Sequence, residues 1–305
     1  MTARHRLPSW QLFAIAVAIW STTWHAILYQ LAHTSPEVGV TLRFALAGML
    51  VLALSAWRGD RLRCTAREHG LLALQGVFLY SLAYLAVYHA ESHVATGLVA
   101  VGYSASPLVN GIGAWLLWRT AIGPRFIVGG LLCIAGVSLI FQPEFAQVAD
   151  ARATALGAAF TVAAVLLSAV GSLAASRNAA NRLPFWPALG WGMLYGAALS
   201  GMVALAGGHS FAWPAAPSWW LSLAYLSIAG TVIAFACFLA LQQRVGPGPA
   251  SAIGVMTPVL ALVISALFEG YRPVLLSWVG AALAMCGNAL VLMPRVGTST
   301  SPRAR

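Results

Sequence analysis

The chain contains no lysine and little charge of any kind. Its 17 basic residues are all arginine, only seven residues are acidic, and charged residues make up 8% of the 305. A soluble protein of this length needs far more charge to cover its surface, so the composition excludes a soluble domain. Hydrophobic residues make up 60% of the chain and gather in runs of about twenty, the length at which a helix spans ~30 Å of hydrocarbon. The sequence therefore predicts an all-α polytopic membrane protein.

Paired cysteines and catalytic motifs are also missing. The four cysteines are scattered with no paired spacing, which indicates free thiols rather than disulfides or a metal site. The chain has no Gly-x-Ser-x-Gly elbow and no phosphate-binding loop. His89, Glu91 and His93 lie close together, but their order differs from that of a zinc-protease helix. We therefore expect no metal, no cofactor and no enzymatic activity.

The apolar runs predict ten membrane spans in two groups of five. The first group covers residues 10–29, 38–57, 70–88, 94–118 and 126–141, and the second covers residues 154–176, 185–206, 219–242, 248–268 and 277–293. We divide the chain into a first repeat (1–141), a linker (142–153), a second repeat (154–293) and a disordered tail (294–305).

Arginine placement predicts the orientation. When the connections are assigned alternately to the two sides, the side that holds both termini carries 14 arginines, whereas the other side carries only Arg152 and Arg272. Cytoplasmic loops are the arginine-rich ones, so we expect both termini in the cytoplasm. The absence of lysine and the heavy use of alanine and glycine suggest a GC-rich bacterial genome, and hence the bacterial cytoplasmic (inner) membrane.

The two halves show related patterns. A shift of 151 residues superimposes Pro107 on Pro258, and the same shift superimposes Gly129 on Gly280 and Gly136 on Gly287. A repeat with an odd number of spans inserts its second copy upside down, so the sequence predicts two inverted five-helix repeats. In transporters with this architecture the substrate site lies near the midplane, between the repeats.

Several local motifs accompany this pattern. They are Ile19-Trp20-Ser21, then Pro36 followed by Thr41-Leu42-Arg43-Phe44, Ser106-Pro107, Thr257-Pro258, and the glycine-rich fifth and tenth spans. With these motifs the chain resembles the drug/metabolite transporter superfamily, specifically its EamA-type ten-helix members, over nearly its whole length. Glu269 matches the family pattern at the end of the ninth span, whereas Trp118 departs from it in the first half. The resemblance implies a secondary carrier with alternating access, and it most suggests the amino-acid exporter branch.

Two groups of residues are candidates for the transport pathway. Pro107 and Pro258 each remove a backbone hydrogen bond in the middle of a span, so we expect kinks that act as hinges near the cavity. Aromatic and polar side chains inside spans are the candidate substrate-binding residues, because a hydroxyl facing lipid at mid-depth is costly. They are Trp20, Trp24, Tyr80, Tyr84, Tyr88, His89, Tyr103, Ser104, Ser106, Asn110, Trp191, Tyr225 and Thr257. Interhelix packing is the alternative reading for each of them.

Arg43 lies about two turns into the second span. It either snorkels, pairs with a helix end, or contacts an anionic group of the substrate. No carboxylate lies at mid-span, which favours a facilitator or exchanger over an ion-driven pump. The predicted function is export of amino acids, neutral or aromatic, with a lipid scramblase or an intramembrane enzyme as alternatives. The expected partners are a small-molecule substrate and membrane lipids, with no nucleic acid and no obligate protein partner.

Overall fold

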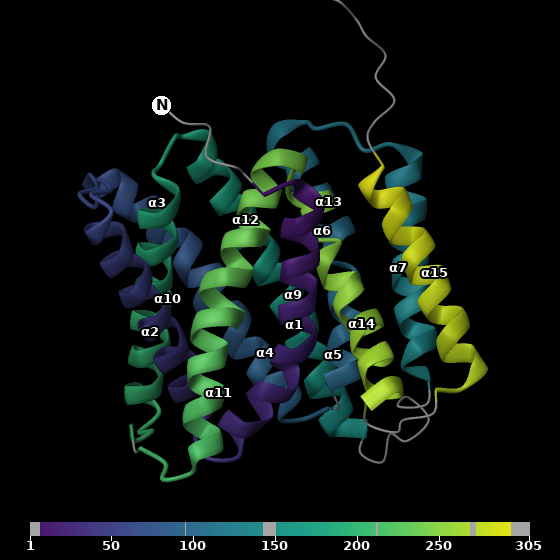
Figure 1. Ribbon diagram of the computed structural model, residues 1–305, viewed down its shortest axis with the longest axis horizontal. Helices are drawn as coiled ribbons and strands as arrows, with labels where there is room; N and C mark the ends of the chain where they lie inside the picture. The colour runs from purple at the N-terminus through teal and green to yellow at the C-terminus, as the bar shows by residue number, and fades with distance from the viewer. Residues whose placement is uncertain (1–6, 95, 143–150, 212, 269–272, 294–305) are drawn as a thin grey trace, which may run out of the picture.

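A computed structural model describes residues 7–94, 96–142, 151–211, 213–268 and 273–293. In this part of the chain every regular element is a helix (Figure 1). The predicted tail, Glu269, Arg272 and most of the predicted linker lie outside the described residues. The first half comprises α1 (Ser9–Leu31), α2 (Pro36–Trp57), α3 (Ala66–Gly76), η1 (Val77–Leu82), α4 (Ala83–Glu91), α5 (Thr96–Tyr103), α6 (Ser106–Trp118) and α7 (Pro124–Ile140).

The second half comprises α9 (Ala151–Ala180), α10 (Phe185–Ala206), α11 (Pro217–Ser227), η2 (Ile228–Ile233), α12 (Ala234–Val245), α13 (Pro247–Ala250), α14 (Ile253–Phe268) and α15 (Leu275–Leu292). Within the described residues, eight helical segments are long and apolar enough to cross a membrane, one of them formed by α13 and α14 with the turn between them, and α7 is a shorter apolar helix. The remaining predicted span consists of α5 and α6, which a turn separates. The protein is thus an all-α polytopic membrane protein.

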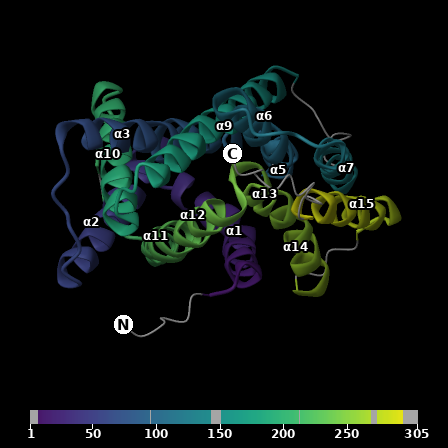
Figure 2. The ribbon, with the colours of Figure 1, turned by 90° about the horizontal axis from the view of Figure 1, so that it is seen from above.

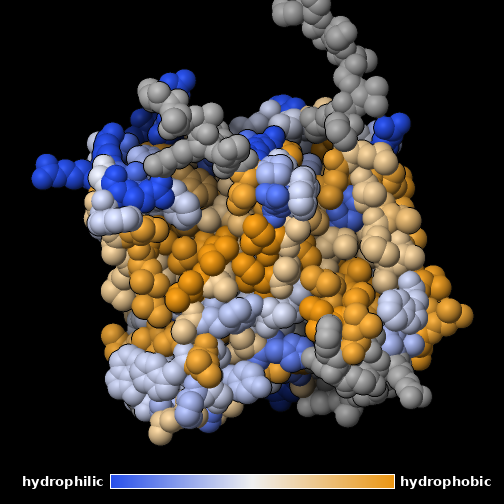
Figure 3. All heavy atoms as spheres, in the orientation of Figure 1, coloured by the Kyte–Doolittle hydropathy of each residue, from blue (hydrophilic) through white to orange (hydrophobic). Residues whose placement is uncertain are grey.

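The surface agrees with this assignment. Figure 3 shows an apolar band across the middle of the face in view, with hydrophilic residues gathered above and below it. Large apolar side chains are exposed on the helices, among them Leu116, Met202 and Leu221. Hydrocarbon, unlike water, solvates such side chains without cost. We call the end at which α1 begins the arginine-rich end, because Arg58, Arg61 and other arginines of the connections lie there.

Local sequence signals explain where several helices begin. Ser35 caps α2 by accepting a hydrogen bond from the Val38 amide, and Pro36 follows at the first helical position. Thr65 and Glu68 form a capping box at the start of α3.

The two proline positions differ from each other in the structure. The helix expected to kink at Pro107 instead ends at Tyr103 and restarts at Ser106, so Pro107 lies in the first turn of α6. Proline is favoured there, because a first-turn N–H has no intrahelical partner to lose. Pro258 lies inside α14, as the sequence predicts.

Two π-helical segments interrupt long spans at equivalent places. The segment η1 divides α3 from α4, and η2 divides α11 from α12. The two segments are offset by the same 151 residues that relate the prolines and glycines. Such segments occur often at functional sites, because they disturb the regular hydrogen-bond ladder of a helix.

The helices α7 and α15 run antiparallel and touch through glycines. A Cβ built on Gly136 would meet the Gly280 carbonyl oxygen at 2.6 Å, and one on Gly129 would meet the Gly287 oxygen at 2.7 Å. The pairs therefore form in reverse order, as two inverted repeats require. Figure 2 shows α7 and α15 at one end of the long axis and α2, α3 and α10 at the other, with α1, α9 and α12 between them.

Candidate functional site

A cavity of about 120 Å³ lies between the two halves of the chain. The elements α1, α2, η1, α4, α5 and α6 line it from the first half, and α9, α12 and the α13–α14 region line it from the second. Its walls are formed by Trp20, Thr23, Trp24, Ile27, Arg43, Leu79, Tyr84, Val87, Tyr103, Ser106, Asn110, Ser168, Ser172, Phe235, Phe238, Ser251, Ile253, Gly254 and Thr257.

One end of the cavity is aromatic. Trp20 packs edge-on against Phe235, with ring centroids 5.2 Å apart, and the same arrangement joins Trp24 and Tyr103 at 6.1 Å. The indole N–H of Trp20 donates to the Gly230 carbonyl oxygen at 3.0 Å. This bond ties α1, in the first half, to the π-helical segment η2 in the second half. The aromatic wall is therefore held by contacts between the halves.

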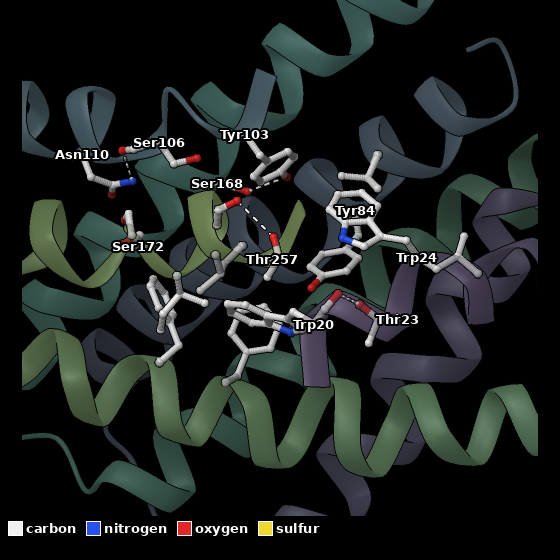
Figure 4. Close-up of a pocket in the computed structure, with 18 of the residues that line it drawn as sticks. Trp20, Thr23, Trp24, Tyr84, Tyr103, Ser106, Asn110, Ser168, Ser172 and Thr257 are labelled. Carbon is white, nitrogen blue, oxygen red and sulfur yellow. Dashed lines mark hydrogen bonds between the residues drawn. The ribbon is translucent and has the colours of Figure 1, made fainter. Parts of the chain in front are cut away.

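The other end is polar. Figure 4 shows Ser106, Asn110 and Ser172 at one end of the cavity and Trp20, Trp24 and Tyr84 at the other. Asn110 Nδ2 donates to the Ser106 carbonyl oxygen at 3.0 Å, whereas Asn110 Oδ1 and Ser106 Oγ are buried and have no partner among the described residues. Buried polar atoms usually have partners. These two atoms are available to a polar group of a bound solute.

Side chains near the two prolines form hydrogen bonds in the cavity wall. Pro258 cannot donate to Gly254 O, and the Thr257 hydroxyl donates to that oxygen at 3.0 Å instead. Tyr103, at the end of α5, binds the Ser168 hydroxyl through its own hydroxyl at 3.2 Å. Both contacts lie in the middle of the cavity wall (Figure 4).

The structure brings together seven of the thirteen side chains that the sequence singled out. Those that line the cavity are Trp20, Trp24, Tyr84, Tyr103, Ser106, Asn110 and Thr257. The other six lie outside it, and neither hinge proline lines it.

Four of these six are bonded or packed elsewhere among the helices. The Tyr80 hydroxyl accepts from Gln75 Nε2 at 3.3 Å, Ser104 Oγ donates to the Val101 carbonyl of the preceding helix α5, and the Tyr225 hydroxyl donates to the Ile19 carbonyl. Tyr88 is fully buried, and its hydroxyl has no partner in the described part of the chain.

The remaining two lie near opposite ends of the molecule. Trp191 donates to the Leu62 carbonyl at 3.1 Å, near the arginine-rich end. His89 lies at the opposite end, where its Nε2 is 2.8 Å from Glu37 Oε1 and its ring stacks on Phe160. Within the described residues, no three His, Cys, Asp or Glu side chains are grouped so that they could hold a metal ion.

Four of the cavity residues that the sequence analysis did not single out form two pairs. Phe235 and Phe238 are three residues apart on α12, and Ser168 and Ser172 are four apart on α9. Each spacing places both side chains on one helix face. Serines repeated in this way inside an apolar span are a signal of a polar, inward face.

Comparison with known proteins identifies the family. The model of the EamA-like transporter family matches residues 8–142 and again residues 155–293. An uncharacterized transporter of Synechocystis sp. is 26% identical over 90% of this chain and 86% of its own length. The uncharacterized inner membrane transporter YicL of Salmonella typhimurium is 24% identical over 91% of this chain and 92% of its own length.

A solved crystal structure shares the fold, with a TM-score of 0.76 at 20% sequence identity, covering 92% of this chain and 95% of the other. The family and the names of the relatives are those of transporters and not of enzymes. A transporter family implies a small-molecule substrate and contact with membrane lipids. The chain therefore belongs to the EamA-like transporter family and is a multi-pass membrane transporter.

Proposed function

We propose that the protein is a secondary transporter that exports small metabolites, most of all neutral or aromatic amino acids, by alternating access. The observation that carries the proposal is the cavity between the halves, with an aromatic wall at one end and unpartnered polar atoms at the other. Such a lining fits a small amphipathic solute, because rings pack on its apolar body and polar atoms bind its polar group. A lipid scramblase is the competing function.

The proposed mechanism is rocking of the two five-helix repeats about the cavity, with Pro107 and Pro258 near the hinges. Two features support it. The α5–α6 turn and the α13–α14 turn interrupt the two spans that carry the prolines, and interrupted helices at a repeat interface are typical of carrier binding sites. The excess of arginine at one end further supports a bacterial inner-membrane location with both termini in the cytoplasm.

Uptake into proteoliposomes that contain the purified protein tests this function. The panel holds labelled neutral and aromatic amino acids, with and without a proton gradient, and a fluorescent phospholipid reports scrambling. We expect saturable amino-acid uptake that Trp24→Ala reduces at least fivefold. Trp57→Ala is the matched control, since Trp57 is 84% exposed at the end of α2 and far from the cavity lining. Lipid scrambling without solute uptake would refute the proposal.

A further inference from the structure

Arg43 is the charged member of the cavity lining, and the second half of the chain holds it in place. Its side chain is only 1% exposed. Its Nε donates to the Thr231 hydroxyl at 2.8 Å and its Nη2 to the Gly230 carbonyl at 3.3 Å. The guanidinium carbon lies 4.7 Å from the centre of the Tyr84 ring and 5.4 Å from that of Phe44. The guanidinium is therefore fixed before any solute binds.

One nitrogen of this guanidinium forms no hydrogen bond among the described residues. Arg43 Nη1 is buried and has no hydrogen-bond partner among the described residues. No carboxylate in the described part of the chain lies within 4 Å of Arg43. A buried charge without a partner is costly, and inside a membrane such a residue usually serves substrate binding. Guanidinium geometry matches carboxylate better than any other common metabolite group.

The other polar groups that interact with Arg43 come from α4. The buried Tyr88 hydroxyl lies near enough to the guanidinium to interact with it, although no hydrogen bond of ordinary geometry joins them, and Glu91, whose two oxygens are buried without partners, interacts with Arg43 electrostatically over a longer distance. Neither residue lines the cavity. Glu91 therefore lies too far from Arg43 to form an ion pair with it, and a carboxylate that enters the cavity would pair with Arg43 at shorter range.

The lining offers a cation no acidic side chain to pair with. No aspartate or glutamate is among the lining residues. An α-ammonium group lies next to its carboxylate, so it would sit at the Tyr84 end, among aromatic rings. Asn110 Oδ1 is at the far end (Figure 4). The site therefore recognises the negative charge of the substrate.

We propose that Arg43 binds the carboxylate of the transported molecule through Nη1, and that the substrates are monocarboxylates with an aromatic or apolar body, whether or not they carry an α-amino group. This proposal rests on the proposed transport function. It goes further, because it names the group that the site recognises and predicts that deaminated analogues are accepted.

Four compounds separate the two charges: phenylalanine, phenylalaninamide, 3-phenylpropionate and 3-phenylpropionamide. Binding to the purified protein is measured by tryptophan fluorescence, and uptake is measured in proteoliposomes. We expect the two carboxylates to bind at least tenfold more tightly than their amides, and 3-phenylpropionate to bind within about fivefold of phenylalanine. If the unaltered protein bound carboxylates and amides equally tightly, that result alone would overturn the proposal.

Variants assign the effect to Arg43. Arg43→Gln is expected to weaken carboxylate binding at least tenfold and to leave amide binding within twofold. Arg58→Gln, at the other end of α2, is the matched control and should change neither. Should Arg43→Gln fail to fold, Thr231→Val replaces it, because it frees Nε without removing the charge and should weaken carboxylate binding at least threefold. Carboxylate binding that survives both changes would refute the role of Arg43.

Glu91→Gln distinguishes substrate binding from an internal ion pair. Because Glu91 forms no ion pair with Arg43, its replacement should leave carboxylate binding within twofold, whereas loss of all binding would show that Glu91 and Arg43 act as a structural pair. Transport without carboxylate preference overturns this proposal alone. Carboxylate binding without transport overturns only the proposed function, and the absence of both overturns the two together.

Discussion

The antiparallel contact between α7 and α15 allows a quantitative test of the fold. In Gly136→Ala the added Cβ would lie 2.4 Å from the Ala284 backbone nitrogen and 2.6 Å from the Gly280 carbonyl oxygen. Ordinary contact begins at 3.4 Å, so the helices must separate by about 1 Å. Backbone atoms cannot rotate away as a side chain can. Overpacking of this kind costs about 1–3 kcal/mol.

The matched control is Gly70→Ala. Gly70 is also helical, in α3, but a Cβ there would meet nothing within 4 Å. Alanine is favoured over glycine in a helix by about 0.5–1 kcal/mol, so this variant should be stabilised by that amount. In Gly136→Ala the same gain offsets part of the cost, which leaves a net loss of about 1–2 kcal/mol. The two variants should therefore differ by about 2 kcal/mol, or about 30-fold in the unfolding equilibrium.

The assay is reversible unfolding in mixed micelles with increasing sodium dodecyl sulfate, followed by tryptophan fluorescence. Transport is measured in parallel, because neither α7 nor α15 lines the cavity. We expect a lower unfolding midpoint for Gly136→Ala and a KM within twofold of the unaltered protein. A midpoint equal to or above that of Gly70→Ala would refute the packing argument. A KM changed more than fivefold would refute the separation of this helix pair from the site.

Two further predictions concern single hydrogen bonds. Trp20→Phe keeps an aromatic ring but removes the donor to Gly230 O at 3.0 Å. Because a net hydrogen bond contributes about 1 kcal/mol, the KM for uptake should rise about three- to tenfold. An unchanged KM would contradict a role for this bond. Gln242→Leu removes bonds of 2.8 and 2.7 Å to the hydroxyl and carbonyl of Ser172, and should lower the free energy of unfolding by about 1–3 kcal/mol. Detergent unfolding measures the second effect, and a midpoint at or above that of the unaltered protein would count against it.

The sequence was sufficient to locate the helical spans. Ten spans, their limits within a few residues and the relation between the halves follow from the length of the apolar runs and from shifted positions such as Pro107 and Pro258. These are properties of the chain in one dimension. A bilayer requires them of any segment that crosses it.

The sequence did not show which face of each span points toward the cavity. Tyr80, Tyr84 and Tyr88 have equal spacing, yet only Tyr84 lines the cavity. The π-helical segment η1 includes Tyr80 and turns fewer degrees per residue than an α-helix, so the four-residue spacing does not place Tyr80 on the face of Tyr84. Tyr88 lies one turn after Tyr84 on the same helix, α4, but outside the cavity lining. A span that is apolar all round also lacks the polar stripe that orients a helix in water.

Arg43 shows the same limit. Its position in the second span allows snorkelling, a helix-end contact or substrate binding, and the sequence favours none of them decisively. The tertiary structure places Thr231 and Gly230 beside it, 188 and 187 residues later in the chain. The length and apolarity of the helices determined that the chain crosses the membrane. Contacts between distant segments decided which side chains meet around the cavity, because only packing sets the rotation of each helix about its axis.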